Sequence, residues 1–475
     1  MEKTIIKPTL LDDVVLKPSV NRLRTPYWNW VNPDKVVIEN PANYYESSLA
    51  EWHLFDPLAA DIECDVLVIG GGLLGTSTAL HLAEQGIETV LIEKDRIGSA
   101  ASGRNGGQLT PGLARWEAED MIERLTHDEA KKLWQFTSVE SMDLLDELIE
   151  KYALEVVRKR GHITAAVHEG HLSALAEGVE ARQHLGEYHA KMVNKTELFT
   201  HINSDIYHGA LIDELGGHLH PLALNRGLAH AFCQNGGVIY ESTEVTEVAP
   251  FNEQTEGIQV ITSGGVIKAR KGVVLSVHSS SFKLLKERNQ TTIPFYTYVS
   301  TTAPLEVDVK TLLPTEHAVY DTQLQIDYYR AVTNNRLLFG GQGTGSCWGQ
   351  EKTRSYLLNR INTVFPQLKN VALDFVWSGV SDLTMNGAVD SRKQGDQCPV
   401  YAVHGWSGHG VAQTVRIGKA IADDMVGKSD DFAMLTRIDH ANIPFGRLLA
   451  PVAIPLAKGA FSLSLLLNPG KMISF

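Results

Sequence analysis

The 475-residue chain has few cysteines and no surplus of basic residues. Its scattered cysteines lack the paired spacing of a metal site and fit a reducing cytoplasm better than a disulfide framework. The 43 lysines and arginines are outnumbered by 56 acidic residues, so the net charge is −13. Because no basic stripe is present, we expect no nucleic-acid partner. The cysteines are Cys64, Cys233, Cys347 and Cys398.

We expect no export signal, and the chain has no uninterrupted long hydrophobic run. Its first residues, MEKTIIKPTLLDDVV, carry acidic side chains where a secretory leader has an apolar core, so we expect a cytoplasmic protein. The most apolar stretch, residues 448–467, is interrupted by Pro451, Pro455 and Lys458. We expect this segment to dock on the protein, and the alternative is an apolar patch in weak contact with a membrane surface.

A strand, a glycine-rich turn, a helix and a second strand follow one another in DVLVIGGGLLGTSTALHLAEQGIETVLIEK, from Asp65 to Lys94. Gly70, Gly72 and Gly75 have the G-x-G-x-x-G spacing, and Glu93 ends the second strand. Such glycines allow a tight turn, the approach of a pyrophosphate and close helix–strand packing, while the carboxylate can bind ribose hydroxyls. The pattern predicts a bound dinucleotide.

The next residues favour FAD over NAD. RIGSAASGRNGGQLTPG, residues 96–112, stands where an NAD domain continues into another helix–strand unit. Its small residues let backbone amides approach a flat ring or a phosphate, and Ser102 and Arg104 can bind oxygens. The alternative is an ordinary surface loop.

A second glycine-rich turn, in HGWSGHGVAQTVRIGKAIADDM at 404–425, runs directly into a helix. The N-terminus of that helix would stabilise the negative charge of a reduced flavin. His409 either contacts the flavin ring or only caps the turn.

The length and the order of strand and helix patterns predict two interleaved domains. We predict an α/β FAD/NAD(P)-binding, Rossmann-like domain and an α+β substrate domain with a mixed antiparallel sheet. An N-terminal extension would occupy 1–60 and an apolar C-terminal tail 428–475. The FAD-binding segments would be 61–113, 216–290 and 374–427, and the substrate-domain segments 114–215 and 291–373.

Six segments, in order, carry a family resemblance: GGGLLG, ASGRNGGQ, GGHLHP, DYYR, NRLLFGG and GWSGHGV. They resemble the FAD-dependent amine and amino-acid oxidoreductases of the D-amino-acid oxidase superfamily, and most of all its gamma-glutamylputrescine oxidases. The resemblance covers residues 52–463 and implies an extended FAD with its ring between the two domains.

Several cofactor-binding residues follow from this resemblance. Those implied at the adenosine end are Gly70, Gly72, Leu74, Gly75, Glu93 and Lys94, with the backbone of Val245 meeting the adenine. Those implied along the pyrophosphate, ribityl chain and ring are Ala101, Ser102, Gly103, Arg104, Asn105, Gly106, Gly107, Gln108 and Leu109. Those implied at the ring itself are Gly379 and, at its pyrimidine edge, Gly408, His409, Gly410 and Val411.

The chain departs from the sarcosine-oxidase branch of this superfamily in three places. Covalent members carry a cysteine in the stretch VWSGVSDLTMNGAVD, which has none, so we expect non-covalent FAD. The strand that matches their oxygen-activating lysine, TIPFYTYVSTTA, has no lysine, which argues against oxygen as the electron acceptor and leaves oxygen, a quinone or a protein as alternatives. His278 stands where relatives usually have glycine.

The best substrate-side residues lie in QIDYYRAV. On a strand, Tyr328 and Arg330 share one face and Tyr329 lies on the other. Arg330 would bind a substrate carboxylate in bidentate fashion, or form a structural Tyr–Arg pair. With His409, these three residues are the predicted catalytic set. His218 and His220 alone do not argue for a metal, so we expect none.

The predicted reaction is hydride transfer from the amine-bearing carbon of a small amine or amino acid to flavin N5, followed by hydrolysis of the imine. The predicted substrate is gamma-glutamylputrescine or a related amine. Alternatives are a cyclic or N-alkyl amino acid such as pipecolate or sarcosine, an NAD(P)-dependent dehydrogenase, and a non-catalytic flavoprotein.

Overall fold

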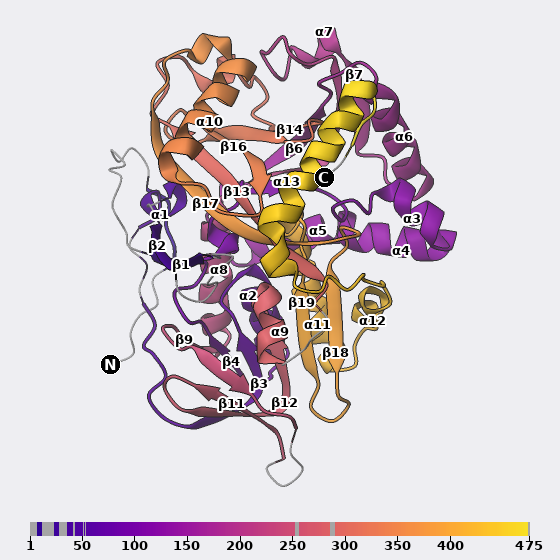
Figure 1. The fold of residues 1–475 in the computed structure, drawn as a ribbon. Helices are drawn as coiled ribbons and strands as arrows, with labels where there is room; N and C mark the ends of the chain where they lie inside the picture. Colours follow the sequence, from indigo (N-terminus) through magenta and orange to yellow (C-terminus); the bar gives the residue numbers. More distant parts are fainter. Residues whose placement is uncertain are drawn as a thin grey trace.

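The computed structural model describes residues 7–11, 23–27, 36–40, 43–50, 52, 54–251, 256–285 and 290–473, without the side chains of 23–27, 36–40, 279, 282 and 447. Two sheets dominate the described chain, one in the lower half of Figure 1 and one in the upper half. Much of the predicted N-terminal extension lies outside the described residues, which include its helix α1 (Tyr44–Ser47) and the paired strands β1 (Leu23–Tyr27) and β2 (Val36–Asn40).

The lower sheet has eight strands, in the order β10-β11-β12-β3-β4-β9, with β19 joined to β12 and β18 to β19. Strands β12, β3, β4 and β9 run parallel, as expected for strands connected by helices. Their bounds are β3 (Ile62–Ile69), β4 (Thr89–Ile92), β9 (Val238–Tyr240), β10 (Val245–Val248), β11 (Ile258–Thr262), β12 (Val266–Leu275), β18 (Asp390–Gln394) and β19 (Val400–His404).

Three largely buried helices pack together on this domain: α2 (Leu73–Glu84), α8 (Pro221–Gln234) and α11 (Val411–Met425). In α2, ten successive residues from Leu73 to Leu82 are buried. A helix that is covered nearly all round needs small or apolar residues on every face, which explains the alanines, serine and threonines of STAL and its neighbours.

The upper sheet has nine strands, in the order β17-β13-β16-β15-β14-β6-β8-β5, with β7 paired to β8. It is antiparallel except for the parallel pair β6 and β14. The bounds are β5 (Gln108–Leu109), β6 (Lys159–Ala165), β7 (Ala190–Asn194), β8 (Gly209–His218), β13 (Thr292–Thr302), β14 (Ala318–Asp321), β15 (Asp327–Val332), β16 (Arg336–Thr344) and β17 (Leu373–Thr384).

Helix α10 (Gln350–Val364) covers one face of the upper sheet and shares a core with it. The other face adjoins the core that continues into the lower domain. The remaining helices are α3 (Ala118–Arg124), α4 (His127–Thr137), α5 (Val139–Lys151), α6 (His171–His184), α7 (Lys195–Leu198), α9 (Ser281–Leu284), α12 (Asp431–Thr436) and α13 (Gly446–Leu467).

The predicted fold class is confirmed by this pairing of a Rossmann-like sheet with a mixed sheet. Two strands belong to the upper sheet although the predicted domain limits assign them to the FAD-binding domain. All of β17 belongs to the upper sheet, although residues from 374 onward were assigned to the FAD-binding domain, and β5 joins the same sheet from within 61–113. The physical reason is that β17 is a full antiparallel partner of β13 and so continues to Thr384.

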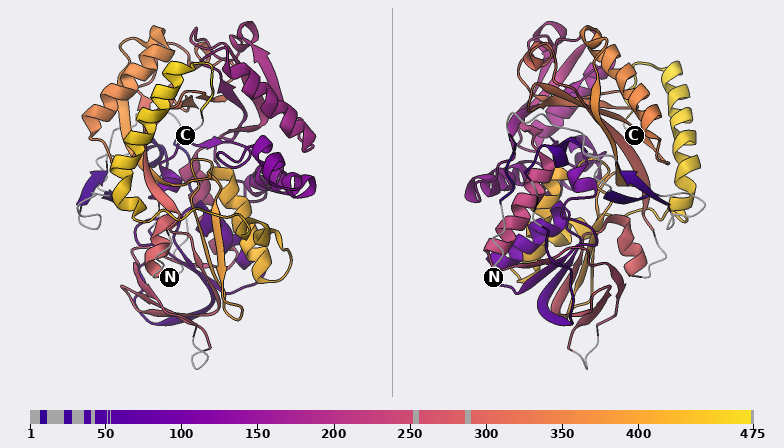
Figure 2. Two further views of the ribbon diagram at one scale, coloured as in Figure 1. Left: turned by 45° about the vertical axis from the view of Figure 1, so that its right-hand side comes forward. Right: turned by 90° about the vertical axis from the view of Figure 1, so that its left-hand side faces the viewer.

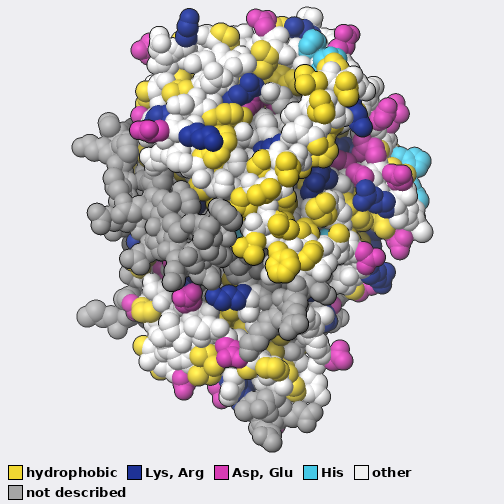
Figure 3. Space-filling view, in the orientation of Figure 1, with side chains coloured by type: hydrophobic (Ala, Val, Ile, Leu, Met, Phe, Trp, Pro, Cys, Tyr) yellow, Lys and Arg dark blue, Asp and Glu magenta, His cyan; other side chains and the backbone are white. Residues whose placement is uncertain are grey.

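The apolar C-terminal segment forms helix α13, which lies on the outside of the molecule in Figures 1 and 2. Its buried apolar side chains are those of Ala450 and Ile454. Among the described residues it is the one helix whose length and composition would allow it to cross a membrane. A column of exposed apolar side chains follows it in Figure 3: Leu448, Leu449, Val452, Leu456, Leu463, Leu466 and Leu467.

Candidate cofactor and substrate site

The glycine turn between β3 and α2 is packed so tightly that side chains would not fit. Gly70 has φ +106°, and a Cβ atom there would lie 2.6 Å from the Ser276 carbonyl oxygen. A Cβ at Gly75 would lie 1.9 Å from the carbonyl oxygen of Gly70. The turn therefore brings the start of α2 directly against the strand, and the N-terminus of this helix would face the predicted phosphate.

Two side chains brace this turn from other parts of the chain. Glu93 accepts hydrogen bonds from the amides of Gly71 (2.7 Å) and Asp95 (2.9 Å), and burial raises the pKa of its carboxyl. Asn225 of α8 donates to the Gly71 carbonyl oxygen (2.8 Å) and accepts from the Thr76 hydroxyl (2.9 Å). The sequence analysis missed Asn225, whose signal is an amide side chain in the middle of a buried helix.

The loop 96–107 lies against the same turn. The Ser102 hydroxyl accepts from the amide of Leu73 (2.9 Å), the first residue of α2. Asn105 donates to the carbonyl oxygens of Ala101 and Ser102 (both 3.0 Å) and accepts from the amide of Gly107 (2.8 Å). The loop is thus held in one conformation by its own side chains, which argues against an ordinary surface loop.

Arg104 points from this loop into the protein and is only 1% exposed. Its Nε donates to the Ser378 carbonyl oxygen (2.8 Å), but neither Nη1 nor Nη2 has a hydrogen-bond partner in the part of the chain that the structure describes. Burial lowers the pKa of the guanidinium to about 10, so it is charged at neutral pH. A buried, charged group with open donors is costly unless a ligand satisfies it.

The start of α11 reaches the same region from the other side. Gln413 donates to the carbonyl oxygens of Thr110 (2.8 Å) and Gly112 (2.7 Å), which ties α11 to the segment after β5. Burial and the charge of Arg182 lower the pKa of His409 to about 4, so its imidazole is neutral at pH 7. Its buried Nδ1 has no hydrogen-bond partner among the described residues.

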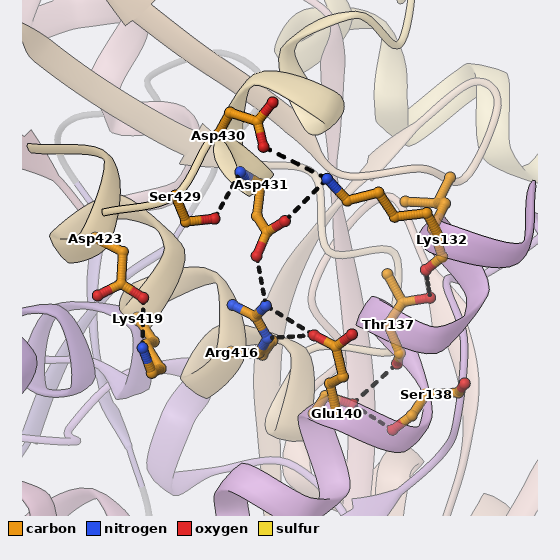
Figure 4. Close-up of polar contacts among 12 residues, drawn as sticks. Lys132, Thr137, Ser138, Glu140, Arg416, Lys419, Asp423, Ser429, Asp430 and Asp431 are labelled. Carbon is orange, nitrogen blue, oxygen red and sulfur yellow. Dashed lines mark hydrogen bonds and ion pairs between the residues drawn. The ribbon is translucent and has the colours of Figure 1, made fainter. Parts of the chain in front are cut away.

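An ion-pair network fixes α11 against three neighbouring helices (Figure 4). Arg416 of α11 bonds to Glu140 of α5 and to Asp431 of α12, at 2.8 Å in each case. Lys132 of α4 contacts Asp431 (3.1 Å) and the neighbouring Asp430 (3.5 Å). Because Arg416 is only 8% exposed, this network holds in place the helix whose N-terminus is predicted to face the flavin.

The three residues predicted on β15 divide as the alternation requires. Tyr329 is fully buried in the core shared with α10, where its hydroxyl donates to Tyr207 (2.9 Å). Tyr328 is partly exposed on the opposite face, and its ring fills the space next to Gly106 and Gly340. Tyr329 therefore has a structural place, whereas Tyr328 faces the loop predicted to hold the cofactor.

Arg330 makes five hydrogen bonds within the protein. Its Nε donates to the Gly106 carbonyl oxygen (2.7 Å), and Nη2 donates to the carbonyl oxygen of Leu219 (3.0 Å) and the hydroxyl of Tyr45 (3.1 Å). Nη1 donates to the Nδ1 of His218 (3.3 Å) and to the carbonyl oxygen of Ala331 (3.5 Å). These bonds use every guanidinium N–H, so the arrangement favours the structural alternative over carboxylate binding.

Three further predicted residues, Gly379, Lys94 and Val245, lie near Arg104 or near Glu93. Gly379 on β17 faces Arg104, whose carbonyl oxygen would lie 3.4 Å from a Cβ at that position. Lys94 is exposed beside Glu93, and Val245 begins β10, two residues after the amide of Thr243 donates to the Glu93 carbonyl oxygen (2.9 Å). Their contacts with FAD stay predictions.

The backbone conformation at His278 explains why glycine is usual at this position. Its φ is +51°, in the left-handed region that favours glycine. Its Nδ1 lies 3.0 Å from Oδ1 of the buried Asp382, and although burial opposes the charge, this carboxylate raises the pKa of the imidazole. The ion pair offers a reason for a histidine here despite the backbone strain.

The fold and the site define a dinucleotide-dependent oxidoreductase with an interleaved second domain. The residues fit FAD, because the glycine turn leaves no room for side chains at Gly70 and Gly75 and the buried Arg104 offers two Nη atoms without a hydrogen-bond partner among the described residues. Asn225, Gln413 and Tyr45, which the sequence analysis missed, hold these parts together.

Residues 65–424 match the DAO family, described as FAD dependent oxidoreductase. The chain is 33% identical to the gamma-glutamylputrescine oxidoreductase of Escherichia coli K12, over 87% of this chain and 95% of that protein. Among solved structures, the glycine oxidase of Geobacillus kaustophilus matches with a TM-score of 0.66 and 20% identity, covering 77% of this chain and 95% of that one. The L-proline dehydrogenase of P. horikoshii matches with a TM-score of 0.65 and 20% identity, covering 78% and 95%.

The chain therefore belongs to the DAO family, and it is an FAD-dependent amine or amino-acid oxidoreductase.

Proposed function

We propose that the protein oxidises a C–N bond of gamma-glutamylputrescine or a closely related small amine. The observation that carries this proposal is the 33% identity to a gamma-glutamylputrescine oxidoreductase along nearly the whole of both chains. The site supports it because Tyr328 presents an aromatic ring to the predicted cofactor loop at Gly106, and His409 is neutral at pH 7.

When bound, FAD supplies a hydride acceptor for the carbon that bears the amine, and water then hydrolyses the imine product. The protein's part is to hold and orient. Arg104 and the start of α11 would hold the cofactor, and Tyr328 would offer a ring against which the substrate packs. The amine must be neutral to release its electron pair, and a desolvated site lowers the pKa of an ammonium group. A neutral His409 adds no charge that would compete with the substrate.

The experiment is anaerobic mixing of the FAD-loaded protein with a panel of amines, followed by the flavin absorbance near 450 nm. We expect gamma-glutamylputrescine to bleach the flavin at least about tenfold faster than pipecolate, sarcosine or glycine at equal concentration. Faster bleaching by a cyclic or N-alkyl amino acid would replace the proposed substrate. A flavin that no member of the panel reduces would contradict the proposal altogether.

The electron acceptor is proposed to be oxygen or another small acceptor in the cytoplasm. Peroxide formation in air, compared with dye reduction without air, distinguishes an oxidase from a dehydrogenase.

We also propose that the exposed apolar side of α13 makes a weak contact with a membrane surface. Seven exposed valine and leucine side chains on one helix support this, because such a face gains free energy on entering a lipid interface. Sedimentation with neutral phospholipid vesicles should carry part of the protein, and less of a Leu456→Ser, Leu463→Ser variant. Equal sedimentation of both proteins, or of neither, would refute the contact.

A further inference from the structure

We propose that His278 donates a hydrogen bond from its imidazole Nε2 to the pyrophosphate of FAD, with Asp382 as the residue that positions the ring. The group recognised is a phosphate anion, and the inference adds a side chain to the predicted cofactor-binding set. It goes beyond the proposed function, because it does not depend on which amine is oxidised.

His278 follows the middle one of three parallel strands that end side by side. Leu275, the last residue of β12, pairs with Ile69 at the end of β3 and with Ala402 of β19. In an open α/β sheet, ligands bind in the crevice outside the carboxyl ends of the strands. His278 therefore lies at the edge of the sheet where a dinucleotide binds, between the glycine turn after β3 and the turn 405–410 before α11.

The residues just before His278 are in direct contact with the glycine turn. The Ser276 amide donates to the carbonyl oxygen of Ile69 (2.9 Å), and its hydroxyl donates to that of Gly70 (2.8 Å). A Cβ atom at Gly70 would lie 2.9 Å from Cγ1 of Val277. His278 is thus the next residue after a segment packed on the turn that is predicted to face the pyrophosphate.

Asp382, on β17 of the upper sheet, holds the imidazole from the other domain. Its Oδ1 lies 3.0 Å from Nδ1 of His278, and its side chain is only 3% exposed. The backbone carbonyl oxygen of Asp382 accepts from the amide of Ser407 (3.0 Å), in the turn before α11. The imidazole is therefore fixed among three parts of the chain that are predicted to surround the extended cofactor.

The second nitrogen of the His278 ring is open to a ligand. The side chain is 34% exposed, and Nε2 bonds to no residue in the part of the chain that the structure describes. A carboxylate at Nδ1 fixes the orientation of the ring, and a protonated imidazole carries a second N–H donor at Nε2. Although burial opposes the charge, Asp382 raises the pKa of this imidazole. His278 thus keeps a free donor, whereas Arg330 has none.

The backbone strain at His278 also indicates a role for its side chain. Its φ of +51° lies in the left-handed region, which glycine adopts at the lowest cost. Strained residues of this kind are frequent at ligand-binding sites, where the surrounding structure maintains them. Phosphate oxygens are strong acceptors for the N–H of a charged donor. A phosphate therefore accounts for both the strained backbone and the open nitrogen.

The first test is a fluorescence titration of the FAD-free protein with FAD. His278→Asn and His278→Gly both tolerate a left-handed backbone and lack the imidazole, so both should fold. We expect each to raise the Kd for FAD by about ten- to a hundredfold, the effect of losing one charge-assisted hydrogen bond. His208→Asn replaces an exposed histidine of the other domain and should leave the Kd unchanged.

The second test identifies the part of FAD that the imidazole contacts. Phosphorus NMR of the bound FAD is recorded between about pH 6 and 9, the range in which a histidine with a raised pKa loses its proton. We expect a phosphorus resonance of the unchanged protein to shift as the imidazole is deprotonated. The same resonance should not respond to pH in His278→Asn.

The pH dependence of the Kd tests the positioning role of Asp382. Asp382 faces the imidazole and His404 of β19 also lies near this carboxyl, while the glycine turn has no titratable side chain and Lys283 of α9 is exposed. Because the protonated ring is the donor, FAD should bind most tightly at low pH and more weakly as the pH rises through the pKa of His278. Asp382→Asn removes the cause of the raised pKa, so this weakening should begin at a lower pH.

Three results would overturn the inference. One is an unchanged Kd for FAD in both His278 variants. Another is a weaker affinity without a titrating phosphorus resonance, which would place the imidazole against a different part of the cofactor. The third is a pH dependence of the Kd that is the same with and without His278. None of these results bears on the proposed function, which flavin reduction by amines tests separately.

Discussion

Replacing Gly75 by alanine is expected to yield protein that purifies without FAD. The added Cβ would lie 1.9 Å from the Gly70 carbonyl oxygen and 2.6 Å from the Ser276 hydroxyl, so α2 must move away from β3. That movement displaces the helix N-terminus that faces the pyrophosphate. We expect FAD content below about a tenth of the normal value and at least about a hundredfold loss of amine oxidation, since a misplaced site costs about that much. The measurements are the ratio of flavin to protein absorbance and the rate of amine oxidation.

The matched control is Gly349→Ala, because a Cβ at Gly349 would meet no atom within 4 Å. This variant should keep normal FAD content and activity. A Gly75→Ala protein with full FAD content would show that the turn does not hold the cofactor as described.

Replacing Arg104 by methionine is expected to change the free and the FAD-bound protein in opposite directions. The substitution removes two buried Nη groups that have no partner among the residues the structure describes, at the loss of the hydrogen bond to the Ser378 carbonyl oxygen. The free energy of unfolding of the FAD-free protein should therefore rise by about 1–2 kcal/mol. FAD affinity should fall at least about a hundredfold, because the charge-assisted hydrogen bonds to the cofactor are lost.

Urea unfolding of the FAD-free proteins and titration with FAD measure the two effects. Lys428→Met is a suitable comparison, since Lys428 is exposed, lies outside the predicted cofactor site and should affect affinity only slightly. If Arg104→Met destabilises the FAD-free protein and binds FAD normally, the guanidinium serves the fold and not the cofactor.

The parts of the fold that could be predicted are those that local sequence determines. The glycine spacing from Gly70 to Gly75 and the helix after Gly410 follow from short-range sterics and hydrophobic periodicity, and both are present. The alternation of Tyr328, Tyr329 and Arg330 also followed from strand geometry. Local sequence could not show which face of this strand would meet the cofactor. It also could not show that acceptors within the protein would take every N–H donor of Arg330, because those acceptors lie elsewhere in the chain.

The residues that were missed act through contacts that sequence proximity does not reveal. Asn225 reaches the dinucleotide turn across 154 positions, and Gln413 reaches Thr110 across 303. The boundary at 374 was misplaced because the pairing of β17 with β13 is a long-range choice of partner.

The most direct test of the whole account is to denature the purified protein with acid and measure FAD in the supernatant. The structure of the turn, the loop 96–107 and the start of α11 predicts close to one FAD released for each chain, and its return on refolding or on titration of the FAD-free protein. A folded preparation that releases no FAD and takes up none would contradict the central claim that these distant segments form one flavin site.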